Sequence, residues 1–279
     1  MNAEVSTIDT RFWDERRRIV RSRNGGWRVG AGVFCHGYNL MEELVGTVSY
    51  AQLLVLNATG RLPERAFGDW LEAALMCMSY PDPRIWCNQI GALAGSLRSS
   101  PIAATAAGIQ ASFSRIYGAG VLLEGGRFIR RALELSKSGL SIPEILAKEA
   151  ALPGGKPILI GYARPVAKGD ERIEALERVA GDRGFERGEH LRLADRIDRH
   201  LQEHYDEGIN FGGYAAAFFA DQGYTPEESE QIVTTLVASG VTACYVDAAG
   251  RPPESFLPMR CDDIDYQGKP PRPVPEKGD

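Results

Sequence analysis

The stretch SYAQLLVLNATGRLPERAFGDWLEAALMCM, residues 49–78, predicts two helices and the turn between them. Ser49 and Gln52 have the spacing of a capping box, in which a hydroxyl and an amide satisfy the free backbone amides at a helix start. The run Gly60-Arg61-Leu62-Pro63 is typical of a helix end. After it, apolar residues recur at helical spacing and therefore share one face. These residues are Phe67, Trp70, Leu71, Ala74, Leu75 and Met78.

The same periodicity recurs along the rest of the chain. Further capping boxes start at Ser141 and at Thr225, and Pro226 then takes the first helical position, where its missing N–H costs nothing. Residues 227–246 are apolar on most sides, which predicts one buried helix. A charged segment carries a single apolar stripe, which predicts a helix lying on the surface. The stripe consists of Ala194, Ile197, Leu201 and Tyr205.

Little of the sequence favours strands. Residues 27–29 and 33–34, on either side of Gly30-Ala31-Gly32, predict one small hairpin. Residues 268–279 hold four prolines among polar residues and predict an extended tail. The fold class expected from the sequence is all-α.

Composition narrows the kinds of protein that the chain can be. The 279 residues are 44% hydrophobic and 25% charged, which is ordinary for a globular protein. The net charge of −5 argues against a nucleic-acid partner, because phosphate binding needs a concentrated basic face. No apolar run is long enough to span a bilayer, and the first thirty residues have no signal-peptide pattern. Five cysteines without a C-x-x-C pair suit a reducing compartment, so we expect a soluble, cytosolic protein.

Short motifs give weak signals. His200-Leu201-Gln202-Glu203-His204 matches the H-x-x-E-H zinc pattern, but a helix dense in charged residues produces it easily and no third ligand is evident. We therefore favour a polar helix face and predict no metal. Gly30-Ala31-Gly32 lacks the last glycine of a dinucleotide loop, and Gly154-Gly155-Lys156 lacks the spacing of a phosphate-binding loop.

Several segments, spread over residues 36–275, carry a resemblance when taken in order. They are GYNLMEELVG (37–46), SYAQ (49–52), GRLP (60–63), EGG (124–126), IGYARPVAKGDER (160–172), NFGGY (210–214), DIDYQG (263–268) and RPVP (272–275). Together they resemble the citrate synthase superfamily, and most of all its short citryl-CoA lyase branch, which is similar to the C-terminal part of ATP-citrate lyase. The resemblance implies an all-α homodimer. It also implies a large helical domain (1–128 and 214–279) and a small one (129–213), with a CoA thioester and an oxo-acid bound between them.

The residues that carry the chemistry of that superfamily are replaced here. Its enol-stabilising histidine corresponds to Glu124, its carbonyl-polarising histidine to Arg164, and its proton-abstracting aspartate to Gly212, which has no side chain. A carboxylate-binding arginine corresponds, less securely, to Val237, and Asp82-Pro83-Arg84 stands where D-H-G is usual. Because a positioned base contributes about 10²–10⁴ in rate, the standard Claisen chemistry is improbable. A Glu124–Arg164 ion pair would neutralise both replacements.

The sequence still predicts a site. We expect Glu124 and Arg164 as the catalytic pair, with Asp82 and His36 as second candidates. The predicted substrate-binding residues are Arg172, Arg272, Asn210 and Tyr214. Lys168 and Arg127 are candidates for contacts with the phosphates of coenzyme A, although solvated surface charge fits them as well.

Two functions of different classes follow. In the first, the chain is a divergent lyase or acyltransferase-type enzyme that acts on a small carboxylate or a CoA thioester with re-purposed residues. In the second, it is a non-catalytic relative that keeps the dimer and the cleft for binding or regulation. We favour the enzyme, because a retained cleft with a new charged pair is more often functional than idle.

Overall fold

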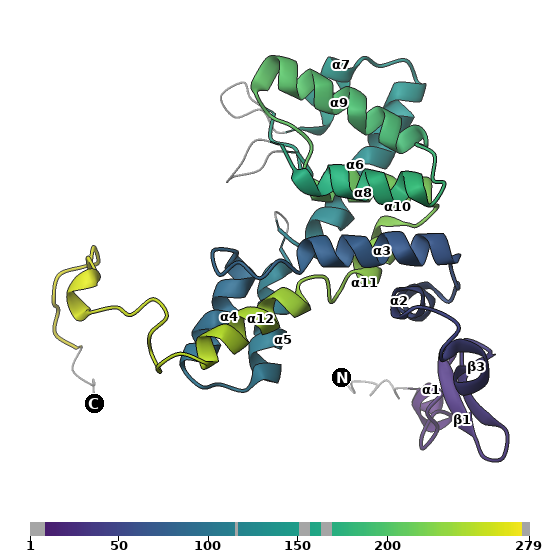
Figure 1. Cartoon of the computed structure of the whole chain (residues 1–279), viewed down its shortest axis with the longest axis horizontal. Coiled ribbons are helices and arrows are strands. Elements are labelled where there is room, and N and C mark those ends of the chain that lie inside the picture. The colour runs from purple at the N-terminus through teal and green to yellow at the C-terminus, as the bar shows by residue number, and fades with distance from the viewer. Residues whose placement is uncertain (1–8, 115–116, 151–156, 163–168, 275–279) are drawn as a thin grey trace, which may run out of the picture. The chain divides into compact units, whose positions relative to one another are not determined.

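The computed structural model describes residues 9–114, 117–150, 157–162 and 169–274. Nearly all of its regular structure is helical (Figure 1), which confirms the all-α prediction. The chain forms two compact units: unit 1 comprises Met1–Cys77 and Ser114–Thr234, and unit 2 comprises Met78–Phe113 and Thr235–Asp279. The large and small domains expected from the sequence have other boundaries and stay a prediction.

Unit 1 begins with the predicted hairpin. After the short α1 (Arg11–Asp14), β1 (Gly25–Arg28) pairs antiparallel with β2 (Gly32–Cys35), and Trp27 lies opposite Val33. The two-residue β3 (Tyr38–Asn39) extends this sheet and leads into a single π-helical turn, η1 (Leu40–Leu44). The hairpin prediction is confirmed.

The opening helix pair forms as expected. In α2 (Tyr50–Thr59) the hydroxyl of Ser49 accepts from the Gln52 amide, and the Gln52 side chain accepts from the amide of Ser49. Gly60 ends the helix with a φ of 73°, a left-handed conformation that glycine adopts without strain. The next helix, α3 (Arg65–Met78), buries most of its predicted apolar stripe.

Aromatic rings form the centre of unit 1. The buried Trp70 of α3 stacks on Phe218 of α10 (Phe211–Asp221) with ring centroids 3.8 Å apart. Phe67, Phe219 and Tyr224 pack around this pair. Nearly all of α10 is buried, so it is the central helix of the unit.

The other helices of unit 1 surround α10. They are α6 (Ala119–Lys137), α7 (Ile142–Glu149), α8 (Glu171–Asp182), α9 (Glu189–Tyr205) and α11 (Pro226–Ile232). Of these, α6 packs against both α9 and α10 (Figure 1). As predicted, α9 buries an apolar stripe that includes Ala194, Ile197 and Leu201.

Unit 2 is a bundle of three helices: α4 (Trp86–Ser96), α5 (Pro101–Ser112) and α12 (Ala238–Ala249). Helices α4 and α12 approach so closely that glycine is required. A Cβ at Gly91 would lie 2.4 Å from the carbonyl oxygen of Val241, and one at Gly95 would lie 2.3 Å from that of Tyr245. Beyond α12 the 3₁₀ turn η3 (Cys261–Asp263) is the one regular element among the described residues, and the part of the predicted tail that the structure describes, 268–274, has neither helix nor strand.

The prediction of one helix over residues 227–246 is wrong. Helix α11 ends at Ile232, residues 233–237 form turns, and α12 begins at Ala238. The interruption falls on Val233-Thr234-Thr235, three β-branched residues whose side chains lose rotamer freedom in a helix. Val233 and Val237 are nevertheless buried, so hydrophobicity alone does not reveal the break.

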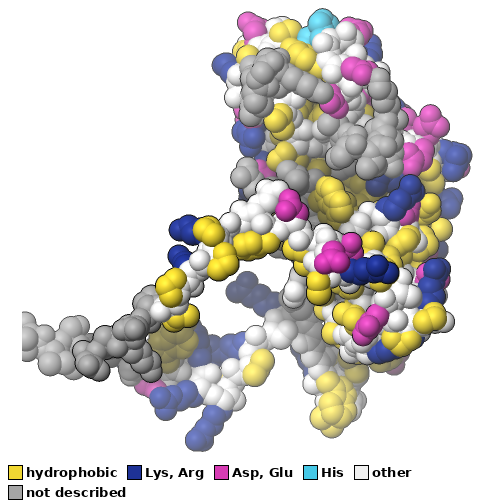
Figure 2. Space-filling view, turned by 90° about the vertical axis from the view of Figure 1, so that its left-hand side faces the viewer, with side chains coloured by type: hydrophobic (Ala, Val, Ile, Leu, Met, Phe, Trp, Pro, Cys, Tyr) yellow, Lys and Arg dark blue, Asp and Glu magenta, His cyan; other side chains and the backbone are white. Residues whose placement is uncertain are grey.

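Acidic and basic side chains are interspersed on the face drawn in Figure 2.

No helix within the described ranges is long and apolar enough to cross a membrane. All five cysteines are free thiols.

Candidate functional site

Glu124, the first candidate, lies on α6 and is held by an arginine one turn further along the same helix. Nη1 of Arg127 donates a hydrogen bond of 2.9 Å to Oε1 of Glu124. The same guanidinium donates through Nη2 to Glu227 of α11 at 2.8 Å. This hydrogen bond lowers the pKa of Glu227 and raises that of Arg127. Arg127, predicted to meet a phosphate, therefore lies between two carboxylates.

A third carboxylate belongs to this group. Glu230 lies on α11, three residues after Glu227, and its Oε1 is buried without a hydrogen-bond partner among the described residues. Burial raises the pKa of Glu230, and the nearby Glu227 and Glu124 add to the rise while Arg127 opposes it. We call Glu124, Arg127, Glu227 and Glu230 the α6–α11 cluster.

Two glycines of α6 lie against neighbouring helices, Gly126 against α11 and Gly125 against α10. A Cβ at Gly126 would lie 3.2 Å from Cβ of Pro226, the first residue of α11. A Cβ at Gly125 would lie 3.4 Å from Cβ of Ala216 on α10. The Glu-Gly-Gly sequence thus serves two purposes: its glycines leave room for the neighbouring helices, and its glutamate is linked through Arg127 to Glu227 of α11.

The position that corresponds to the superfamily's base has no room for a side chain. A Cβ at Gly212 would lie 2.4 Å from Cγ1 of Val121 on α6. The neighbouring Gly213 is just as confined, since a Cβ there would lie 2.2 Å from the carbonyl oxygen of Gly161. The Val121 side chain at Gly212 and the Gly161 backbone at Gly213 therefore fill the space beside the start of α10.

Arg172 is held in a fixed orientation at the start of α8. Its Nε donates to Oδ1 of Asp170 at 2.6 Å and its Nη2 to Oδ2 at 2.5 Å, while its guanidinium lies 5.1 Å from the ring centroid of Phe211. The Asp170 side chain is fully buried and also accepts from the amide of Phe211 at 2.7 Å. Asp170 thus links α8, Arg172 and the start of α10.

The other two substrate-binding candidates of α10 have roles in the fold. Oδ1 of Asn210 caps α10 by accepting from the amides of Gly212 and Gly213 at 2.9 and 3.2 Å. Tyr214 is only 3% exposed, and burial raises the pKa of its hydroxyl. Tyr214 belongs to the aromatic core.

Asp82, a second candidate for catalysis, lies in unit 2 just before α4. It forms a bidentate pair with Arg84, with the shortest contact at 2.6 Å, and this pairing lowers its pKa. A lowered pKa makes a carboxylate a weaker base. Its backbone carbonyl accepts from Nδ2 of Asn88 at 3.0 Å, which fixes the turn.

His36 follows β2 in a left-handed conformation, with a φ of 47°. Its ring packs against Gly60, and its Nε2 is buried without a hydrogen-bond partner among the described residues. Arg272 lies exposed on the tail, where it lines a shallow hollow with Tyr266 and Lys269.

Two predicted residues, Arg164 and Lys168, lie outside the described residues, so the proposed Glu124–Arg164 pair stays a prediction. The Gly154-Gly155-Lys156 motif lies outside them too. His200 and His204 stack with ring centroids 4.2 Å apart, and Nδ1 of His204 is 2.9 Å from the carbonyl oxygen of His200. Among the residues that the structure describes, no group of three or more His, Cys, Asp or Glu is arranged to hold a metal.

Sequence reasoning missed Glu227 and Glu230. Both lie within the segment whose apolar composition predicted one buried helix, directly after the capping box of Thr225 and Glu228. Their spacing of three residues on a helix was the available signal, because residues at that spacing share a face.

Comparison with known proteins identifies the fold. No family profile and no curated protein matches the chain. Among solved structures, it is similar to the citryl-CoA lyase of Hydrogenobacter thermophilus, with a TM-score of 0.76 and 24% identity over 92% of this chain and 98% of that one. It also matches the ATP citrate lyase of Methanosaeta concilii in complex with (3S)-citryl-CoA, with a TM-score of 0.74 and 14% identity, covering 94% of this chain and 44% of that one.

A third match is the citrate synthase of Thermotoga maritima, with a TM-score of 0.59 and 14% identity over 82% of this chain and 60% of that one. The chain therefore has the citrate synthase-like fold, as the sequence resemblance predicted.

Proposed function

We propose that this protein is a divergent enzyme of lyase or acyltransferase type that acts on a small carboxylate or a CoA thioester. Its fold is shared with proteins whose solved complexes hold citryl-CoA, or citrate and coenzyme A. Arg172, which Asp170 holds through Nε and Nη2, is the candidate group for a substrate carboxylate, because a guanidinium in a fixed orientation is suited to bind one.

The observation that carries the proposal is the α6–α11 cluster. Glu230 has a buried carboxyl oxygen and a raised pKa beside the ion-paired Glu124 and Arg127. A raised pKa makes a carboxylate a stronger base, which favours a role in general acid–base catalysis. Arg127 supplies the positive charge that stabilises a developing anion. The cluster thus offers a group for proton transfer and a group for anion stabilisation, beside the position where Glu124 replaces a histidine.

The alternative is a non-catalytic relative with a binding or regulatory role. The packing at Gly212 favours it, because the side chain of Val121 fills the space of the missing base. In this alternative, Glu124 and Arg127 form an ordinary structural ion pair.

A ligand panel tests the proposal. Acetyl-CoA, coenzyme A, oxaloacetate, citrate and other di- and tricarboxylates are added to the full chain, and thermal unfolding and release of the free thiol of coenzyme A are followed. A ligand that binds the native state raises the melting temperature by mass action. We expect Glu124→Gln and Glu230→Gln to lower turnover, whereas Glu134→Gln, on an exposed part of α6, leaves it unchanged.

The outcomes separate the two functions. Ligand binding without turnover, unaffected by either substitution in the cluster, supports the regulatory alternative. If no ligand shifts the melting temperature and the substitutions change nothing, the enzyme proposal fails.

We further propose that the chain forms a homodimer and works in the cytosol. Three apolar side chains are exposed at helical spacing along α4 and its C-cap: Trp86 at 53%, Leu93 at 46% and, at the C-cap, Leu97 at 58%. An exposed apolar stripe of this kind marks interaction surfaces. The five free cysteines suit a reducing compartment. In such a dimer, Arg272 of the extended tail is a candidate to reach the site of the partner subunit.

A further inference from the structure

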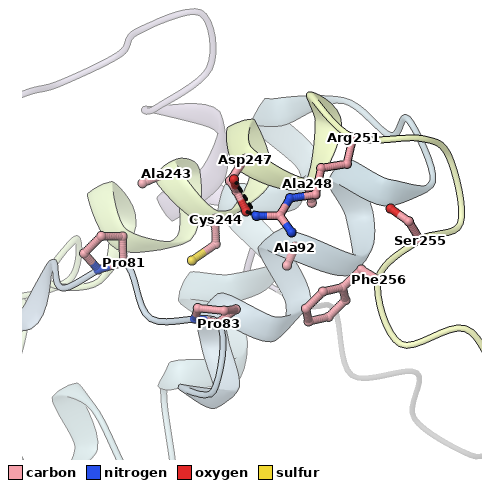
Figure 3. Close-up of a pocket in the computed structure, with 10 residues that line it drawn as sticks. All are labelled: Pro81, Pro83, Ala92, Ala243, Cys244, Asp247, Ala248, Arg251, Ser255 and Phe256. Carbon is pink, nitrogen blue, oxygen red and sulfur yellow. Dashed lines mark hydrogen bonds and ion pairs between the residues drawn. The ribbon is translucent and has the colours of Figure 1, made fainter.

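Unit 2 encloses a pocket of about 380 Å³ between α4, α12 and the segment that follows α12 (Figure 3). This volume is within the range of ~300–1,000 Å³ typical of small-molecule sites. All of its lining residues belong to unit 2. They are Pro81, Pro83, Ala92, Ala243, Cys244, Asp247, Ala248, Arg251, Ser255 and Phe256.

The floor of the pocket is apolar and made of small side chains. Ala92 is 2% exposed, and Cys244 and Ala248 are each 4% exposed, while the ring of Phe256 packs against all three. Gly91 and Gly95 bring α4 close to α12, and the residues beside this contact have small side chains. These small side chains leave the hollow of the pocket unfilled.

The wall that carries Phe256 is fixed by hydrogen bonds. The buried Ser96 accepts from the amide of Glu254 through its carbonyl oxygen at 3.1 Å and from the amide of Phe256 through its hydroxyl at 3.2 Å. Arg98 donates to the carbonyl oxygens of Ala249 and Arg251 at 2.6 and 2.5 Å. The pocket is therefore preformed, which lowers the entropic cost of binding.

One ion pair lies at the mouth of the pocket. Nη2 of Arg251 is 2.8 Å from Oδ2 of Asp247, and both side chains are 64% exposed. Figure 3 shows the guanidinium reaching Asp247, with Phe256 on another side of the hollow. An exposed pair of this kind contributes little to stability, so a ligand can replace it at low cost. The mouth thus offers one negative and one positive group beside an apolar floor.

We propose that this pocket binds a free α-amino acid with an apolar side chain. The ammonium group binds the carboxylate of Asp247, the carboxylate binds the guanidinium of Arg251, and the side chain lies over Ala92, Ala248 and Phe256. A zwitterion satisfies both charges at once. A simple acid or amine of the same shape would leave one of the two protein charges without its partner.

Cys244 gives a direct readout of occupancy, because its side chain lines the pocket. Burial raises the pKa of this thiol, so we expect slow alkylation. A bound ligand covers it and slows the reaction further. The exposed Cys261 in the same unit is the internal control, since ligand binding leaves its access to the reagent unchanged.

The test uses the full chain with L-leucine and L-phenylalanine, and with two analogues of leucine that carry one charge, 4-methylpentanoate and 3-methylbutylamine. Calorimetry measures affinity, and mass spectrometry of alkylated peptides measures the protection of Cys244. We expect the amino acids to bind, the analogues to bind about tenfold more weakly or worse, and only Cys244 to be protected.

Three variants sharpen the test. Asp247→Asn and Arg251→Gln change exposed residues, so the fold should be kept, and each should weaken amino-acid binding about tenfold or more. Arg65→Gln removes an arginine of the same exposure, 64%, from another ion pair between residues four apart, in unit 1, and should leave binding unchanged. The proposal is overturned if no amino acid binds at millimolar concentration, if an analogue binds as well as leucine, or if Asp247→Asn and Arg251→Gln both keep full affinity.

Discussion

Val121 and Gly212 are in contact across α6 and α10: a side chain at Gly212 would begin only 2.4 Å from Cγ1 of Val121. The two residues therefore have to be considered together. The position where the superfamily resemblance puts a catalytic aspartate is a helix–helix contact in this chain, and a side chain introduced there has to displace the side chain of Val121.

The first prediction follows from this contact. Gly212→Asp should lower the melting temperature and bring no Claisen activity, because overpacking costs about 1–3 kcal/mol and burial of a charge adds to it. Gly212→Ala should also destabilise, and Val121→Ala should recover part of that loss in the double variant, as thermal unfolding of a double-mutant cycle would show.

Gly181→Ala on α8 is the control for the helix glycines. A Cβ there meets nothing within 4 Å, so this variant should be neutral or stabilised by about 0.4–1 kcal/mol. If Gly212→Ala behaved like Gly181→Ala, the contact with Val121 would not be restrictive.

The second prediction concerns pH. The pKa of Glu230 is raised in the folded protein, so the folded state holds its proton to higher pH than the unfolded state does. Its stabilising contribution is present at acid pH and is lost as the pH rises through the folded-state pKa. Glu230→Gln, which mimics the protonated form, should therefore stabilise the protein near pH 7, and this gain should vanish as the pH falls below the ordinary value of 4.5.

Melting temperatures of both proteins between acid and neutral pH check this prediction. Glu134→Gln, on an exposed part of α6, should show no such pH-dependent difference. A Glu230→Gln variant less stable than the parent at neutral pH would mean that the carboxylate is stabilised by the cluster, contrary to the prediction.

Local patterns were sufficient to predict the helix starts at Ser49, Ser141 and Thr225. Ser49 with Gln52 and Thr225 with Glu228 form the capping boxes that their spacing predicts, because those hydrogen bonds involve only neighbours in sequence. The end of α11 at Ile232 was missed, since buried turns and buried helices have the same apolar composition.

The site was harder to predict than the fold. The ion pair from Arg127 to Glu227 joins residues a hundred positions apart, and nothing in the local sequence indicates that contact. The resemblance predicted a partner for Glu124 from another matching segment, whereas the described partner, Arg127, comes from α6 itself.

The third prediction concerns Asp170. Its buried carboxylate holds Arg172 and also accepts from the amide of Phe211. Asp170→Asn should destabilise the protein by about 3–5 kcal/mol, the usual cost of breaking a buried ion pair. It should also weaken the binding of any carboxylate that Arg172 holds. Denaturant unfolding and calorimetry measure the two effects, and Asp182→Asn, at an exposed position of the same helix, should change neither.

The fourth prediction concerns the proposed dimer. Leu93 lies in the middle of the exposed apolar stripe of α4. Replacing it with aspartate should shift the protein from dimer to monomer in sedimentation experiments at micromolar concentration, because a charge buried in an apolar interface without a partner is strongly unfavourable. Met76→Asp, at a position of α3 that is 70% exposed, introduces the same charge in unit 1 and should leave the dimer intact. A parent protein that sediments as a monomer would contradict both the dimer and the proposed role of Arg272, since an arginine on the tail can reach a partner's site only if the partner is bound.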